Sequence, residues 1–137
     1  MFHRYSEHAR QALFRARYEA SCYGTAEIDD IHLLLGVLTA DTALAERLGG
    51  LGVTTAKIRE RLTRTCTNVT TTTVDLPLSR PARQALILTA EEADRVGSIE
   101  IEPSHLLTAL TRAESSGTAE MLLAFGVRPE RLREFLR

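Results

Sequence analysis

The stretch Ala9-Arg10-Gln11-Ala12-Leu13 recurs 73 residues later as Ala82-Arg83-Gln84-Ala85-Leu86. At the same spacing, Glu19-Ala20, Gly24, Ile28 and His32-Leu33-Leu34 return as Glu92-Ala93, Gly97, Ile101 and His105-Leu106-Leu107. After a slip of one residue, Ala45-Glu46, Leu48 and Gly52-Val53 return at a spacing of 74 as Ala119-Glu120, Leu122 and Gly126-Val127. Because the match persists in order over about sixty residues, each half is one copy of a single structural unit.

The pattern within each copy predicts helices. Ser6 is placed to cap a helix whose apolar residues recur every three or four positions until Gly24. Asp29 or Asp30 caps a second helix, which is apolar on nearly all sides over residues 31–38 and is therefore predicted to be central. A short third helix over residues 43–48 and a fourth after Val53 complete the copy. The expected fold class is all-α.

The two copies are expected to form a single domain over residues 1–137. We place repeat one at about 2–64 and repeat two at about 78–137. The segment between them, about 65–77, is rich in threonine and other β-branched residues, which disfavour helix. We predict that it is an extended linker ending near Pro77.

Composition excludes several classes of function. The net charge of −1, with acids and bases interspersed, lacks the basic excess of a nucleic-acid binder. No apolar run reaches roughly 18 residues, so no membrane span is expected. The amino terminus has no signal-peptide pattern, which predicts a cytoplasmic protein. Cys22 and Cys66 lack Cys-x-x-Cys spacing and are expected to be reduced thiols.

Catalytic motifs are missing from the sequence. It contains no phosphate-binding Gly-x-x-x-x-Gly-Lys-Ser/Thr loop, no Gly-x-Ser-x-Gly elbow and no His-Glu-x-x-His pair. His32 and His105 recur, but neither has an acid or a second histidine three or four residues later. We interpret them as packed histidines that bond to backbone. Two alternatives stay open: a small hydrolase or metal-binding protein that uses His32 and His105, and a helical DNA-binding regulator. We predict no catalytic residue, metal or cofactor.

The repeated residues resemble a known family. The first copy carries Phe2-x-Arg4-Tyr5-Ser6-Glu7-x-Ala9-Arg10, then Ala20, Gly24, Ile28 and His32-Leu33-Leu34-Leu35-Gly36. The second carries Leu78-Ser79-Arg80-Pro81-Ala82-Arg83, then Glu92-Ala93, Gly97, Ile101 and His105-Leu106-Leu107. Both resemble the amino-terminal domain of Clp-family ATP-dependent unfoldases of the ClpC and ClpA types, over essentially residues 2–136.

The resemblance implies two tandem four-helix repeats related by a pseudo-twofold axis. It implies a domain that is not an enzyme and that recruits substrates and adaptor proteins to the unfoldase ring, since ATP hydrolysis in the full-length relatives belongs to downstream AAA+ modules. The implied partners are adaptor proteins, protein substrates and the Clp ATPase itself. We expect a monomer in isolation, either free-standing or excised from a longer protein.

The resemblance also implies two kinds of site. The groove that binds peptide-like ligands in ClpC-type relatives corresponds here to Phe2, Leu78 and Arg83. Some relatives recognise phosphorylated arginine, and Ser6 and Ser79 match hydroxyl residues at helix starts, where an anion can bind. The family's glutamate before each histidine is replaced here, since Ile31 precedes His32 and Ser104 precedes His105. Glu27, Asp30 or Glu102 are nearby acids that could take its place.

Overall fold

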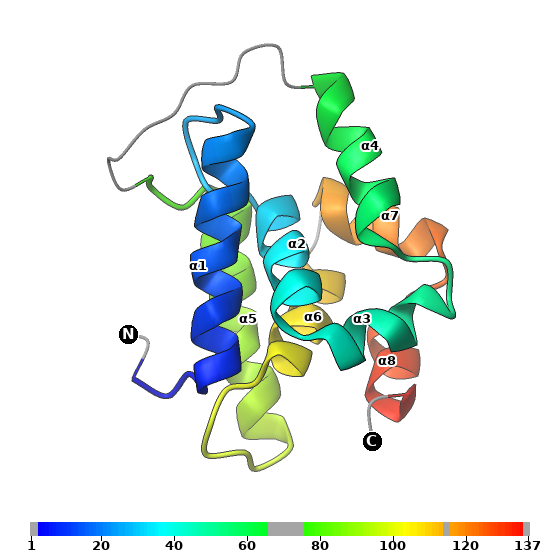
Figure 1. Ribbon diagram of the computed structural model, residues 1–137. Helices are drawn as coiled ribbons and strands as arrows, with labels where there is room; N and C mark the ends of the chain where they lie inside the picture. Colours follow the sequence, from blue (N-terminus) through cyan, green and yellow to red (C-terminus); the bar gives the residue numbers. More distant parts are fainter. Residues whose placement is uncertain (1–2, 66–75, 114–115, 136–137) are drawn as a thin grey trace.

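The computed structural model describes residues 3–65, 76–113 and 116–135. These residues fold into eight helices, which confirms the all-α prediction (Figure 1). The helices are α1 (Glu7–Cys22), α2 (Asp30–Ala40), α3 (Thr42–Gly49), α4 (Thr55–Thr65), α5 (Arg80–Arg95), α6 (Pro103–Arg112), α7 (Gly117–Ala124) and α8 (Pro129–Phe135). None of the helices in the described residues is long and apolar enough to cross a membrane.

The predicted helix starts are confirmed. The Ser6 hydroxyl accepts the amide of Ala9 at 3.1 Å, and the Ser79 hydroxyl accepts that of Ala82 at 3.2 Å. Asp29, the first of the two predicted candidates, caps α2. The three prolines at helix starts lie in first turns, where no intrahelical amide bond is lost: Pro81, Pro103 and Pro129.

The helix α2 lies at the centre of the fold, as its sequence predicts. All residues from Leu33 to Leu38 are buried. The helix packs most extensively on α1 and also contacts α3, α4, α5, α6 and α7. Its counterpart α6 packs most extensively on α5 and contacts α2, so the buried residues of both copies join in one hydrophobic core. The two copies are therefore not separate units.

The segments that precede the helices pair reciprocally across the two copies. Tyr5, ahead of α1, forms a parallel bridge with Ile101, ahead of α6. Leu78, ahead of α5, forms the same bridge with Ile28, ahead of α2. Each bridge has two hydrogen bonds of 2.8–2.9 Å. Because residue i of one copy contacts j of the other and the reverse also holds, this is the contact pattern of a twofold-related pair.

Part of the sequence-based organisation lies outside the described residues. The predicted linker of about 65–77 falls mostly in the undescribed range 66–75, and Phe2 also lies outside the described residues. The boundaries of the two repeats therefore stay predictions. What the structure adds is that residues 76–79 return to pack against the start of α2, where they contribute to a surface groove.

Candidate functional site

An apolar groove lies between α1 and the start of α5. Its volume is about 400 Å³. The lining residues are Arg10, Leu13, Phe14, Arg17, Ile28, Leu33, Leu76, Leu78 and Leu86. Most of these side chains are aliphatic or aromatic, and both charged ones are arginines on α1. The groove therefore offers an apolar surface bordered by positive charge.

Two features of the chain build this groove. The bridge between Ile28 and Leu78 brings the segment before α5 against the segment before α2. The amide of Ile28 donates to the Pro77 carbonyl at 2.8 Å, and the amide of Ser79 donates to the Ile28 carbonyl at 2.9 Å. Phe14 contributes one wall from α1 and is 69% exposed. This exposure means that Phe14 is not part of the core. A ligand that covered the ring would be stabilised, because apolar surface would leave water.

Two of the three residues predicted for a peptide-binding groove are described by the structure. Leu78 lines the groove. Arg83 is exposed and does not line the groove. Its Nη1 donates a 2.7 Å hydrogen bond to the carbonyl of Leu78, which does line it. Phe2 lies outside the described residues. The role of these three residues in binding stays a prediction.

Ser6 and Ser79, the predicted anion sites, are mostly buried. Both residues are 7% exposed and both hydroxyls are used as helix caps. The Ser79 hydroxyl also donates to an Asp29 carboxylate oxygen at 2.7 Å, which ties the start of α5 to the start of α2. An anion at either serine would have to replace these bonds, so phosphate binding there stays a prediction.

His32 and His105 are packed residues that bond to backbone, as predicted. The Nδ1 atom of His32 accepts the Asp29 amide at 2.9 Å, and that of His105 accepts the Glu102 amide at 2.9 Å. Burial lowers the pKa of both imidazoles below 6.5, so both are neutral with the proton on Nε2. Among the described residues, no three His, Cys, Asp or Glu side chains gather as a metal site would require.

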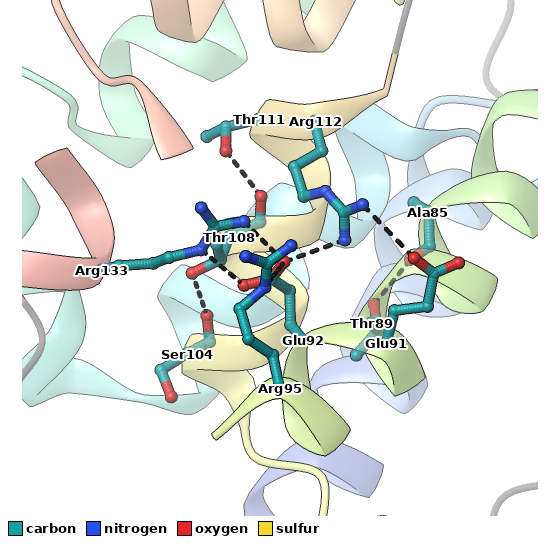
Figure 2. A network of polar contacts seen from close by, with 10 residues as sticks. All are labelled: Ala85, Thr89, Glu91, Glu92, Arg95, Ser104, Thr108, Thr111, Arg112 and Arg133. Carbon is teal, nitrogen blue, oxygen red and sulfur yellow. Dashed lines mark hydrogen bonds and ion pairs between the residues drawn. The ribbon is translucent and has the colours of Figure 1, made fainter. Parts of the chain in front are cut away.

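A buried carboxylate fastens the last helix of each copy to the first. Arg59 on α4 makes two 2.6 Å bonds to Glu19 on α1. At the matching place in the second copy, Arg133 on α8 donates to both carboxylate oxygens of Glu92 on α5, at 3.0 and 2.8 Å (Figure 2). Each pair joins helices that are distant in sequence, which gives the pairs a structural role.

The second copy adds two further arginines to this arrangement. Arg112 Nη1 donates to Glu92 at 2.9 Å, and Arg95 Nε lies 3.7 Å from the same carboxylate (Figure 2). Burial by itself would raise the pKa of Glu92, but the hydrogen bond from Arg133 and the charges of Arg133, Arg112 and Arg95 outweigh it and lower that pKa. Glu92 is therefore ionised near neutral pH.

Comparison with known proteins places this geometry in a family. Residues 4–125 match the model of the Clp repeat N-terminal domain. The chain belongs to this family. In Clp ATPases, domains of the family bind substrates and adaptors and are not themselves catalytic.

Two curated relatives show how much of a longer protein the family domain covers. A protein of Mycobacterium tuberculosis with no characterised function is 40% identical over 114 residues, which are 82% of this chain and 45% of the relative. The chaperone protein ClpB of Oceanobacillus iheyensis is 27% identical over 135 residues, which are 98% of this chain and 17% of the relative. The chain therefore spans less than half the length of these curated relatives.

Solved structures of the family share the fold. The N-terminal domain of the chaperone ClpD from Arabidopsis thaliana has a TM-score of 0.77 at 22% identity, covering 98% of this chain and 93% of that one. The Hsp104 N-terminal domain from Candida albicans has a TM-score of 0.72 at 13% identity, covering 96% and 87%. At these identities the likeness shows the fold alone, and it confirms the predicted Clp N-terminal architecture.

Several site residues were not predicted from the sequence. Phe14 and its neighbours Arg10 and Arg17 lie on the outer face of α1, which the helical pattern alone marks only as solvent-facing. The signal that was available is an aromatic residue at a position that should be exposed. Leu86 belongs to the repeated stretch, and the repeat pattern gives no sign that it lines the groove.

Proposed function

We propose that the chain is a non-catalytic protein-binding domain that receives apolar segments of substrates or adaptor proteins for a Clp-type AAA+ unfoldase. The observation that carries the proposal is the groove beside α1, which leaves Phe14 69% exposed in a chain of the Clp repeat N-terminal domain family. An apolar segment that fills the groove would cover this ring and the adjacent leucines.

The charges around the groove favour a particular kind of segment. Arg10 and Arg17 lie on α1 on either side of Phe14, one helical turn or so away in each direction. A segment with apolar residues at its centre and acidic residues beside them would pair with both features. Exposed ion pairs contribute little affinity, so the apolar contacts would supply most of the binding free energy.

The remaining parts of the proposal follow from the family. The partners would be protein substrates, adaptor proteins and the Clp ATPase itself, in the cytoplasm, and the domain would be a monomer in isolation. Nucleic acid is not among the proposed partners because the net charge is −1. A mobility-shift assay at low salt would reveal nucleic-acid binding if it occurred.

The duplication supplies a matched control for testing the groove. Ile87 on α5 occupies the position in the second copy that Phe14 occupies in the first. It is 63% exposed and is not among the residues that line the groove. The probe would be a fluorescein-labelled peptide with leucine and phenylalanine at its centre and aspartate at both ends, followed by fluorescence anisotropy.

Phe14→Ala should weaken this probe and Ile87→Ala should not. Covering the exposed part of a phenylalanine is worth about 1–2 kcal/mol, so the Kd should rise about fivefold to thirtyfold. Both side chains are exposed, so both variants should keep the wild-type circular dichroism and melting temperature. Equal effects of the two substitutions, or no binding by the wild-type protein, would contradict the proposal.

A further inference from the structure

The α5–α6 loop, residues 96–100, holds two large apolar side chains in solvent. Val96 is 62% exposed, and Ile99 is 87% exposed, the highest fraction among the large apolar side chains of the described residues. The matched positions of the first copy are Tyr23, which packs against the core, and Ala26, which has only a methyl group. The second copy therefore exposes more apolar surface at this loop than the first.

Hydrogen bonds from one arginine hold the α5–α6 loop in place. Arg4 donates to the carbonyl of Ser98 at 3.1 Å and to that of Ile99 at 3.2 Å. Its Nη2 also pairs with Asp94, at the end of α5, at 2.9 Å. Because these bonds fix the backbone of the loop, a partner that covers Val96 and Ile99 does not have to order the loop first.

One acidic side chain of the loop is not neutralised. Asp94 is paired with Arg4, and Arg95 lies 3.7 Å from Glu92, so these charges are offset. Glu100 is exposed, directly follows the exposed isoleucine and makes no ion pair with a described side chain. The loop thus presents apolar side chains with a free carboxylate next to them.

The loop matches the kind of segment that the groove beside α1 is proposed to receive. Among the described residues that line the groove, most are apolar, two are arginines and none is an acid. Arg10, one of these arginines, is exposed and makes no ion pair with a described side chain. An apolar loop with a free glutamate beside it is complementary to this surface.

The loop cannot reach the groove of its own chain. Leu78 lines the groove just before α5 begins, and the loop follows the end of that helix. The helix α5 has 16 residues and is therefore about 24 Å long. Figure 1 shows residues 76–79 and the α5–α6 loop at opposite ends of α5. Since Arg4 ties the loop to its own end of the fold, a loop that fills the groove must come from another molecule.

We propose that the α5–α6 loop of one copy binds in the groove beside α1 of a second copy. This rests on the function proposed above, because the loop is one example of the apolar, acid-flanked segments that the groove would receive. Each copy offers its loop to one neighbour and its groove to another, which is a head-to-tail contact.

The contact is weak. Two apolar side chains and one ion pair fall short of the roughly 1,200 Å² that stable interfaces bury. The dilute protein is therefore a monomer, and pairing begins only at high concentration. Where many copies are held close together, the loop competes with substrates for the groove.

Two complementary variants test this contact. Ile99→Ser alters the loop and keeps the groove, while Phe14→Ala alters the groove and keeps the loop. Both side chains are exposed, so both variants should keep the wild-type melting temperature. Unlabelled Phe14→Ala protein is titrated into ¹⁵N-labelled Ile99→Ser protein, and the amide shifts are followed by NMR. Saturable shifts should appear in α1 and in residues 76–79 of the labelled protein.

A second substitution in the titrant shows whether the loop is what binds. Adding Ile99→Ser to the Phe14→Ala titrant should raise the Kd about tenfold or more, because the isoleucine side chain supplies most of the apolar surface that the loop can bury. Adding Leu123→Ser is the matched control, because Leu123 is also exposed but lies on α7, outside the loop and the groove lining. It should leave the Kd within about twofold, as expected for an independent site.

Equal Kd values for these two titrants, or no shifts at millimolar protein, would overturn the proposal. The fluorescein-labelled peptide separates this failure from that of the proposed function. If the peptide binds Ile99→Ser protein while the titration shows no pairing, the loop contact is wrong and the function of the groove stands. If the peptide does not bind either, the function of the groove is wrong as well.

Discussion

Replacing Gly36 with alanine should destabilise the protein strongly, because the backbone of α1 leaves no room for a side chain at this residue of α2. A Cβ atom added to Gly36 would lie 2.1 Å from the Ala12 carbonyl oxygen and 3.0 Å from the Ala16 amide nitrogen. Both obstructing atoms belong to the backbone of α1, so no flexible side chain can move aside. The helices would have to separate along the most extensive helix–helix interface of the first copy.

Two opposing effects set the size of the change. Alanine in place of glycine inside a helix contributes about 1 kcal/mol in favour of the folded state. Overpacking a closed core costs about 1–3 kcal/mol and sometimes more, and a 2.1 Å contact with rigid backbone lies above that range, at about 4 kcal/mol. We expect a net loss of about 3 kcal/mol, which for a chain of this size lowers the Tm by about 10 °C or more.

Urea unfolding followed by circular dichroism measures this loss. The matched position in the second copy is Ala109, which is fully buried, so the second copy already accommodates a methyl group at this position. Ala109→Gly should cost only about 1–2 kcal/mol, from helix propensity and the lost methyl group. If the free energy of unfolding of Gly36→Ala lies within about 1 kcal/mol of the wild-type value, the predicted overpacking is absent. The backbone of α1 would then not lie as close to Gly36 as described.

Two further predictions concern the ion pairs and the histidines. Arg59→Ala should lower the free energy of unfolding in urea by about 2–3 kcal/mol, because it leaves Glu19 buried without its arginine. Arg133→Ala should cost less, because Arg112 still donates to Glu92. A larger loss for Arg133→Ala would contradict the pairing described. Because the pKa of His32 is lowered from 6.5 in the folded state, the free energy of unfolding should fall as the pH drops below 6.5. His32→Gln can still accept the Asp29 amide, and it should make this dependence on pH less steep. If His32→Gln left the dependence of stability on pH unchanged, His32 would not be the buried, neutral imidazole described.

The helical fold was predictable because its signals are local or repeated. Ser6 and Ser79 cap their helices through contacts three residues away, and Pro129 starts α8 where the sequence places it. The all-apolar stretch of α2 identified the central helix. The reciprocal bridges, Tyr5 with Ile101 and Ile28 with Leu78, join segments that are far apart in sequence. They were not visible in either segment by itself, because such pairing depends on the assembled core.

The site was predicted only in part. Leu78 was placed in a groove by resemblance, while Phe14 was missed because a single helical pattern cannot tell a solvent-facing residue from one at a groove. The cluster of arginines around Glu92 was missed for a different reason. Glu92 and its partners Arg112 and Arg133 are 20 and 41 residues apart in sequence, so no motif search joins them. A position-by-position comparison of the two copies would have found them.

Isotope-filtered NMR gives the most direct test of the central proposal, which is that apolar protein segments bind beside α1. With ¹³C-labelled protein and the unlabelled leucine- and phenylalanine-containing peptide, nuclear Overhauser contacts should connect the peptide to the Phe14 ring and to the methyl groups of Leu78 and Leu86. Leu123 on α7 is 51% exposed and lies outside the groove lining, so it serves as the internal reference. Contacts to Leu123 in the absence of contacts to Phe14 would contradict the proposal.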